Sequence, residues 1–253
     1  GQAIYIDDMP EQENLLHGAP VLSKVACGKI KKINSDKLKD LPFFTKIITA
    51  KDIPGENEIG PIKNGEPILA DDFFSYLGQP VAIVLAKTHQ EAIYASSLVE
   101  IELEFTTKPI LNLDDAYEQK SFLEDPMILE KGNIKKDMSK SNYTLSGDFE
   151  IGGQDHFYLE THVAITFPGE NDEYVVWSST QHPTEVQHGV GKVLNIPSAK
   201  IDSKVRRLGG GFGGKESQAT IFAAMSALGA YLTQKPVKIC LLYTSPSPRD
   251  FVR

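Results

Sequence analysis

The alternation of hydrophobic and polar positions in the first hundred residues predicts short strands around one helix. Residues 80–86 read Pro-Val-Ala-Ile-Val-Leu-Ala, a continuous apolar run typical of a buried strand. Thr88 and Glu91 form a capping-box pattern ahead of apolar positions at helical spacing, which predicts a helix to about Leu98. Residues 99–105 alternate apolar residues with glutamates, which predicts a strand with one buried face. A short strand is also expected at 3–6.

The pattern becomes polar and irregular from about 106 to 142, which predicts a segment connecting two domains. Regular patterns return at Tyr143. Strands are expected at 143–151, 157–167, 173–178, about 200–207 and 237–239, and helices at 183–194 and about 216–232. We therefore predict an α+β fold with one domain at 1–105, a linker at 106–142 and a second domain at 143–239.

Both ends of the chain carry unusual signals. The chain begins with Gly1 rather than Met and enters an apolar run at once, so we expect further sequence upstream. Residues 240–250, Cys-Leu-Leu-Tyr-Thr-Ser-Pro-Ser-Pro-Arg-Asp, resemble the translation of a transposase-type sequencing adapter. We therefore predict that 240–253 is a non-native tail; a natural Ser/Pro-rich linker is the alternative.

Composition narrows the possible partners. The 253 residues contain 26 Lys+Arg and 34 Asp+Glu, a formal charge of −8, and no basic run that would follow a phosphate backbone, so nucleic acid is disfavoured. No window holds the roughly 18 apolar residues of a membrane span, so we expect a cytoplasmic protein without membrane contact. Cys27 and Cys240 are too few and too far apart for a disulfide framework, a zinc site or an iron–sulfur site.

The densest candidate for chemistry is residues 208–216, Leu-Gly-Gly-Gly-Phe-Gly-Gly-Lys-Glu, between a predicted strand and a predicted helix. Glycines allow close approach of a ligand to the backbone, and a helix start offers N–H groups to an anion. Lys215 completes the spacing of a nucleotide P-loop, but Glu216 stands where a Mg²⁺-binding Ser or Thr is expected. No acidic residue about 20 positions later completes a dinucleotide fingerprint either. From the pattern alone, a tight strand-to-helix turn remains possible.

Three segments together resemble a known family. The first is residues 208–216, called the glycine run below. The other two are residues 152–160 (Gly-Gly-Gln-Asp-His-Phe-Tyr-Leu-Glu) and residues 179–181 (Ser-Thr-Gln). Together they look like the first molybdopterin-binding segment of the xanthine dehydrogenase and aldehyde oxidase family. Residues 5–8 (Tyr-Ile-Asp-Asp) and 78–81 (Gly-Gln-Pro-Val) resemble that family's α/β hammerhead domain. The resemblance runs in register from 1 to about 239, and it implies a hammerhead domain followed by the first part of a molybdopterin-binding domain.

The resemblance assigns roles to individual residues. Gln181 matches the glutamine that hydrogen-bonds an oxo ligand on molybdenum, and Phe212 matches the residue whose backbone amide touches the metal's coordination sphere. Glu216 matches a glutamate that orients a purine substrate, whereas aldehyde oxidases tend to carry an apolar residue there. By the same resemblance, Gly210, Gly211 and Gly213 are expected to bind the cofactor together with Gln181 and Phe212. Without the resemblance, Gln181 would be interpreted as an exposed amide at a strand end.

The implied activity is molybdenum-dependent hydroxylation of a purine, hypoxanthine or xanthine, with electrons passed through [2Fe-2S] clusters and FAD to NAD. The iron–sulfur and FAD groups are expected on a partner chain or on missing sequence, in an assembly expected to be dimeric. The family's catalytic glutamate lies C-terminal of this segment, so no catalytic base is assigned, and we expect the chain alone to be inactive and free of molybdenum. The alternatives are an aldehyde or other N-heterocycle oxidoreductase, a nucleotide-binding domain using residues 209–215, and a non-catalytic α+β module.

Overall fold

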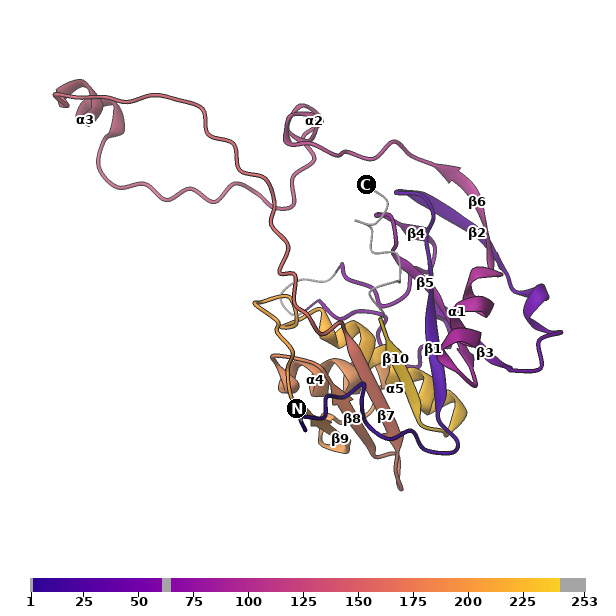
Figure 1. Ribbon diagram of the computed structural model, residues 1–253. Helices are drawn as coiled ribbons and strands as arrows, with labels where there is room; N and C mark the ends of the chain where they lie inside the picture. The colour runs from indigo at the N-terminus through magenta and orange to yellow at the C-terminus, as the bar shows by residue number, and fades with distance from the viewer. Residues whose placement is uncertain (1, 61–64, 242–253) are drawn as a thin grey trace. The chain divides into compact units, whose positions relative to one another are not determined.

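A seven-stranded mixed sheet organises the larger part of the structure, a computed structural model that describes residues 2–60 and 65–241 (Figure 1). Its strands lie in the order β3 (Phe44–Thr49), β5 (Pro80–Ala86), β1 (Leu16–Leu22), β10 (Val237–Cys240), β7 (Val163–Pro168), β8 (Tyr174–Ser178) and β9 (Ile201–Lys204). β1 runs parallel to β10 and β8 runs parallel to β9, while the other neighbours are antiparallel. The fold is therefore α+β, as predicted.

Helices cover both faces of this sheet. Along β5, Ile83 and Leu85 join the core formed with α4 (Pro183–Leu194) and α5 (Ala219–Thr233), while Ala82 and Val84 pack with Ala95 of α1 (His89–Ser97). Because side chains alternate between the faces of a strand, α1 lies opposite α4 and α5. Burial on both faces explains why residues 80–86 are continuously apolar, and the predicted strand and its following helix are confirmed.

The N-cap of α1 is Thr88, as predicted, but the Glu91 carboxylate accepts from the Thr88 hydroxyl and not, as in a full capping box, from its backbone N–H. The Thr88 hydroxyl accepts a hydrogen bond from the Glu91 backbone N–H, and Ala92 and Ala95 are buried. The next strand, β6 (Glu100–Thr106), joins β2 (Gly28–Asn34) and β4 (Phe73–Phe74) in a separate three-stranded sheet. β6 lies at the edge of this sheet, and of its residues only Ile101 and Leu103 are half-buried. The expectation of a buried Phe105 is wrong, because that residue is exposed near the end of the strand.

A crossover connection positions the candidate site. β8 leads through residues 179–182 into α4, and the chain returns by a short 3₁₀ helix (Ser198–Lys200) to β9, which is parallel to β8. After β9 the glycine run leads to α5. Thr220 of α5 approaches Gly189 of α4 so closely that a Cβ at Gly189 would lie 2.4 Å from the Thr220 methyl group. The two helices therefore cross tightly behind the loops that follow β8 and β9.

Several predicted boundaries are wrong, each for a local reason. Residues 2–5 form no strand, because Ile6 and Asp8 begin a turn in which the Asp8 carboxylate accepts from the Tyr5 N–H. β7 begins at Val163 rather than at 157, since Phe157 has a left-handed backbone (φ 42°). α5 begins at Ala219 rather than about 216, because turns fill residues 212–215 and Gln218 is the N-cap.

The chain divides into two compact units, Gly1–Lys108 with His156–Arg253 and Pro109–Asp155. The second unit holds two short helices, α2 (Leu113–Glu118) and α3 (Ile134–Lys140), capped by Asn112 and Asn133. The strand expected at 143–151 is not formed: this segment has no strand partner among the described residues, and its apolar side chains are exposed, namely Tyr143, Leu145, Phe149 and Ile151. A strand requires a neighbouring strand to pair its backbone groups.

The long sheet takes strands from both predicted domains, since β1, β3 and β5 lie within 1–105 and β7 to β10 lie within 143–240. The domain boundaries drawn from the sequence remain predictions. Of the predicted tail, Cys240 pairs with Val163 at the end of β10 and the Leu241 N–H donates to the His162 carbonyl, while 242–253 lie outside the described residues. No helix in the described part is long and apolar enough to cross a membrane.

Candidate functional site

The candidate site lies at the carboxyl ends of the parallel strands β8 and β9. Gln181 follows β8 and precedes α4, and the glycine run follows β9 and precedes α5. Loops at the carboxyl ends of adjacent parallel strands commonly converge on a ligand. The crossover therefore brings together two segments that are separated by about thirty residues in the sequence.

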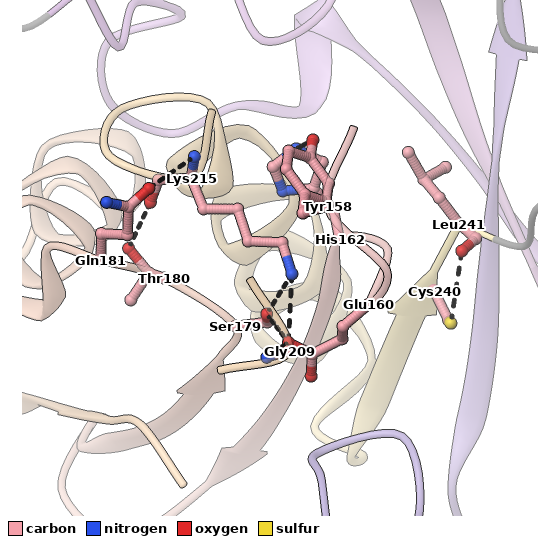
Figure 2. A network of polar contacts seen from close by, with 10 residues as sticks. All are labelled: Tyr158, Glu160, His162, Ser179, Thr180, Gln181, Gly209, Lys215, Cys240 and Leu241. Atoms are coloured by element: carbon pink, nitrogen blue, oxygen red, sulfur yellow. Dashed lines mark hydrogen bonds and ion pairs between the residues drawn. The ribbon is translucent and has the colours of Figure 1, made fainter. Parts of the chain in front are cut away.

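Gln181 is bonded directly to the glycine run, and Figure 2 shows its contact with Lys215 at the end of that run. Its Oε1 accepts hydrogen bonds from the backbone N–H groups of Gly213 (2.9 Å) and Lys215 (3.3 Å). Its own backbone N–H donates to the Lys215 carbonyl (2.9 Å), which the Thr180 hydroxyl also reaches (3.1 Å). Since Oε1 is occupied by two donors, the amide nitrogen of Gln181 is the group that remains to meet a ligand, and it can only donate.

The glycine run folds as a tight loop with left-handed backbone at three positions. These are Gly210 (φ 96°), Phe212 (φ 52°) and Gly213 (φ 96°). A Cβ at Gly211 would lie 2.4 Å from the Gln181 Oε1, so a larger residue there would displace the Gln181 amide. The backbone N–H groups of Gly210, Gly211 and Phe212 have no acceptor among the described residues. Successive N–H groups in such a loop can bind an anion or the oxygen of a polar ligand.

A buried ion pair lies beneath the loop. Lys215 is fully buried, and its Nζ donates to the Glu160 Oε2 (3.1 Å) and to the Ser179 hydroxyl (2.8 Å). The same Glu160 oxygen accepts from the Ser179 hydroxyl (2.6 Å) and from the Gly209 N–H (2.8 Å). Burial lowers the pKa of Lys215, while the Glu160 carboxylate opposes that shift.

Two aromatic groups complete this layer. The Lys215 ammonium lies 4.7 Å from the centre of the Tyr158 ring, and the Tyr158 hydroxyl is 2.7 Å from the His162 Nε2. The His162 ring stacks on Phe222 of α5. Burial, together with the nearby Lys215 cation, lowers the pKa of His162 to about 3, so this ring is neutral near pH 7.

The predicted site residues differ in exposure, since Gly211 is buried and Gly210 is half-buried. Phe212 is 73 % exposed, and Gln181, Gly213 and Glu216 are also exposed. Glu216 lies in a bend ahead of α5, so the expectation that it occupies the first turn of this helix is wrong. His156 lies against the loop, since its ring carbons would contact a Cβ at Gly214. Among the described residues, no three His, Cys, Asp or Glu side chains form a group that could hold a metal ion.

The position of Lys215 excludes the nucleotide P-loop. In a P-loop the lysine extends to the β- and γ-phosphates of the nucleotide. Here its ammonium is buried beneath the loop and is occupied by Glu160, Ser179 and the Tyr158 ring. The glycine run therefore offers a ligand neutral backbone and amide donors.

Comparison with known families matches two successive parts of the chain. Residues 1–107 match the aldehyde oxidase and xanthine dehydrogenase a/b hammerhead domain, and residues 118–245 match the molybdopterin cofactor-binding domain. The chain belongs to the xanthine dehydrogenase and aldehyde oxidase family. The predicted succession of a hammerhead domain and a molybdopterin-binding domain is thus confirmed. The match at the glycine run and in the N-terminal part is therefore not a coincidence.

Individual relatives from this family cover nearly the whole chain. It is 38 % identical over 243 residues to a xanthine dehydrogenase/oxidase of Gallus gallus and 40 % identical to that of Felis catus, matching 96 % of this chain in each case. The chain spans only 18 % of the length of these curated relatives. An aldehyde oxidoreductase from Desulfovibrio gigas shares the fold with a TM-score of 0.82 at 23 % identity, over 95 % of this chain and 28 % of that one.

The donor set fits the cofactor that this family binds. A molybdenum–pterin group presents oxygen atoms, and the loop offers the Gln181 amide nitrogen beside three backbone N–H groups. The sequence makes Gln181 and the glycine run candidates, and the structure brings them into contact, but the sequence gives no sign of the ion pair below them. Glu160 belongs to a matching segment, and Lys215 stands at the position of a phosphate ligand. The burial of a lysine cannot be inferred from its neighbours in the sequence.

Proposed function

We propose that this chain supplies one wall of the molybdenum–pterin site in a xanthine dehydrogenase-type hydroxylase that acts on a purine. The orientation of the Gln181 amide carries the proposal: Oε1 is tied to Gly213 and Lys215, so the nitrogen is held as a donor toward the cofactor. Phe212, Gly210 and Gly211 add backbone N–H groups on the same loop. The exposure of Gln181 and Phe212 on this wall is consistent with a cofactor that is held from several segments at once.

When bound, the molybdenum group supplies the redox chemistry of the hydroxylation. The residues of this chain are proposed to bind that group and to orient it. The Gln181 nitrogen would donate to an oxygen of the bound group, and the Phe212 N–H would help to hold that group from the glycine run. Neutral donors held in fixed directions stabilise developing charge on oxygen without rearranging during the reaction. We propose no general base among the residues of this chain.

Glu216 is proposed to orient the purine. Its carboxylate is exposed, and it follows directly after the residue that ends the cofactor loop. A carboxylate can accept hydrogen bonds from the N–H groups of a purine ring, whereas an aldehyde offers none. An aldehyde or other N-heterocycle as substrate is the second candidate, and Glu216 is the feature that disfavours it.

The remaining steps need groups outside this chain. Electrons are proposed to leave through [2Fe-2S] clusters and FAD to NAD, on a partner chain or another part of a longer protein. The assembly is proposed to be a cytoplasmic dimer. We also propose that the 253 residues alone neither retain molybdenum nor oxidise xanthine. Elemental analysis of the purified chain checks this, and stoichiometric molybdenum would contradict it.

The cofactor role is tested by Gln181→Ala in the full-length protein that carries this chain. Loss of one fixed donor should lower kcat by about 10²-fold or more while the molybdenum content remains near that of the unmodified enzyme. Gln187→Ala is the matched control, because Gln187 lies on α4 and donates only to the Ile201 carbonyl. Equal kcat values for the two variants would refute the role of Gln181.

The substrate role is tested by Glu216→Val in the same protein. We expect xanthine turnover to fall by about 10²-fold or more, because the ring loses a charged acceptor, while aldehyde turnover is retained or rises. Glu170→Val, at an exposed carboxylate before β8, serves as the control and should leave the ratio of the two rates unchanged. An unchanged ratio in Glu216→Val would contradict the purine assignment.

A further inference from the structure

One buried carboxylate oxygen holds both ends of the glycine run. Glu160 Oε2 accepts the Gly209 N–H at 2.8 Å, at the beginning of the loop, and the Lys215 ammonium at 3.1 Å, at its end. The Ser179 hydroxyl lies between them, donating to Glu160 and accepting from Lys215. The loop of five residues between Gly209 and Lys215 is therefore closed at its base by charge-assisted hydrogen bonds.

Lys215 also connects this base to Gln181. Its N–H donates to the Gln181 Oε1, and its carbonyl accepts from the Gln181 N–H and the Thr180 hydroxyl. Every polar group of Lys215 is thus bonded, and each partner belongs to the segments that form the candidate site (Figure 2). A displacement of the Lys215 side chain would move the backbone to which Gln181 is tied.

The loop is also seated on the side chains of residues 158 and 160. A Cβ at Gly209 would lie 2.5 Å from the Glu160 Cβ, and a Cβ at Gly214 would lie 2.6 Å from the Tyr158 ring. The first and last glycines of the run therefore make room for the residues that hold it. This close contact is independent of the hydrogen bonds and indicates the same arrangement.

We propose that Lys215 and Glu160 are positioning residues, whose buried ion pair clamps the base of the glycine run and thereby fixes the direction of the Gln181 amide. The identity of the ligand that this amide meets rests on the proposed function. The clamp itself is a property of the chain without cofactor, so it can be tested separately.

The test measures amide hydrogen exchange by NMR in the 253-residue chain. In Lys215→Met, the N–H groups of Gly213 and residue 215 should exchange about tenfold faster or more, because the Oε1 that accepts from them is no longer held. The Gln181 side-chain NH₂ resonances should also move toward those of a free glutamine. Lys238→Met is the matched control, since Lys238 is a buried lysine paired with a carboxylate elsewhere in the sheet.

A second variant separates positioning from stability. Glu160→Gln with Lys215→Met removes both charges, so stability should be largely regained, yet the end of the loop stays unclamped and Gly213 should still exchange fast. If Lys215→Met alone does not fold, this double variant decides: faster exchange at Gly213 than in the unmodified chain supports the clamp, and unchanged rates overturn it.

The clamp is also overturned if Lys215→Met accelerates exchange at Gly213 no more than Lys238→Met does. Failure of the proposed function gives a different pattern, in which the exchange results hold but Gln181→Ala leaves kcat of the full-length protein unchanged.

Discussion

Lys215 and Lys238 are both buried lysines, but the carboxylates paired with them differ in solvent exposure. The Lys215 side chain is 0 % exposed and its partner Glu160 only 12 % exposed, so that pair is almost dry. The Lys238 side chain is 7 % exposed, but its partners Asp7 and Glu11 are 50 % and 55 % exposed. One pair is withdrawn from solvent at both ends, and the other is half in water.

This difference determines how much order each pair can impose. A carboxylate in water can exchange a protein donor for a solvent molecule at little cost, so the Lys238 pair tolerates movement. Glu160 cannot be hydrated in this way. Its Oε2 accepts hydrogen bonds from three protein donors, and its Oε1 is buried without a partner among the described residues. A dry pair contributes little net stability but penalises every arrangement in which it is broken. The dry pair lies under the loop that we propose to bind the cofactor.

The largest effect should separate the two lysines by their free energies of unfolding. Lys215→Met leaves the Glu160 carboxylate buried without its cation, which should cost about 3–5 kcal/mol. Lys238→Met leaves Asp7 and Glu11 able to hydrate, so its cost should be about 1 kcal/mol or less. Urea unfolding of both variants checks this, and equal losses would show that the two pairs are equivalent.

A smaller effect should follow when both charges of the dry pair are removed. In Glu160→Gln with Lys215→Met, a neutral amide oxygen can still accept from Gly209 and Ser179, and no buried charge remains. The free energy of unfolding should return to within about 2 kcal/mol of the unmodified chain. The same urea measurement checks it. A double variant as unstable as Lys215→Met alone would indicate that packing, and not charge, explains the loss.

The contrast between the lysines also shows where sequence reasoning is effective. Local patterns were sufficient for α1 and β5, because a capping box and a two-sided apolar run are contained within a few neighbouring residues. The alternation at 143–151 predicted a strand that is not formed, since pairing depends on another segment. Family resemblance identified Gln181, and the structure places it against the glycine run. The clamp could not be predicted, because Glu160 and Lys215 are 55 positions apart and each resembles an ordinary surface charge in the sequence.

The smallest predicted effect concerns the histidine beside each lysine. Burial is the main cause that lowers the pKa of His162, to about 3, and the pKa of His17, which lies near Lys238, is also lowered by burial but raised in part by Glu11. As pH falls below about 6.5, His162 becomes protonated in the unfolded chain but stays neutral in the folded chain. The stability that is present above that pH is therefore lost progressively toward pH 3.

The slope for one such group is roughly 1 kcal/mol per pH unit. His162→Phe preserves a ring for stacking on Phe222 and removes the titrating group, so its unfolding free energy should fall less steeply than that of the unmodified chain between about pH 6.5 and pH 5. His17→Phe should flatten the curve by a smaller amount, because Glu11 offers the protonated His17 a counter-charge. Urea unfolding across this pH range measures both slopes. A larger change for His17→Phe would mean that the half-hydrated pair, and not the dry one, controls the acid sensitivity of the fold.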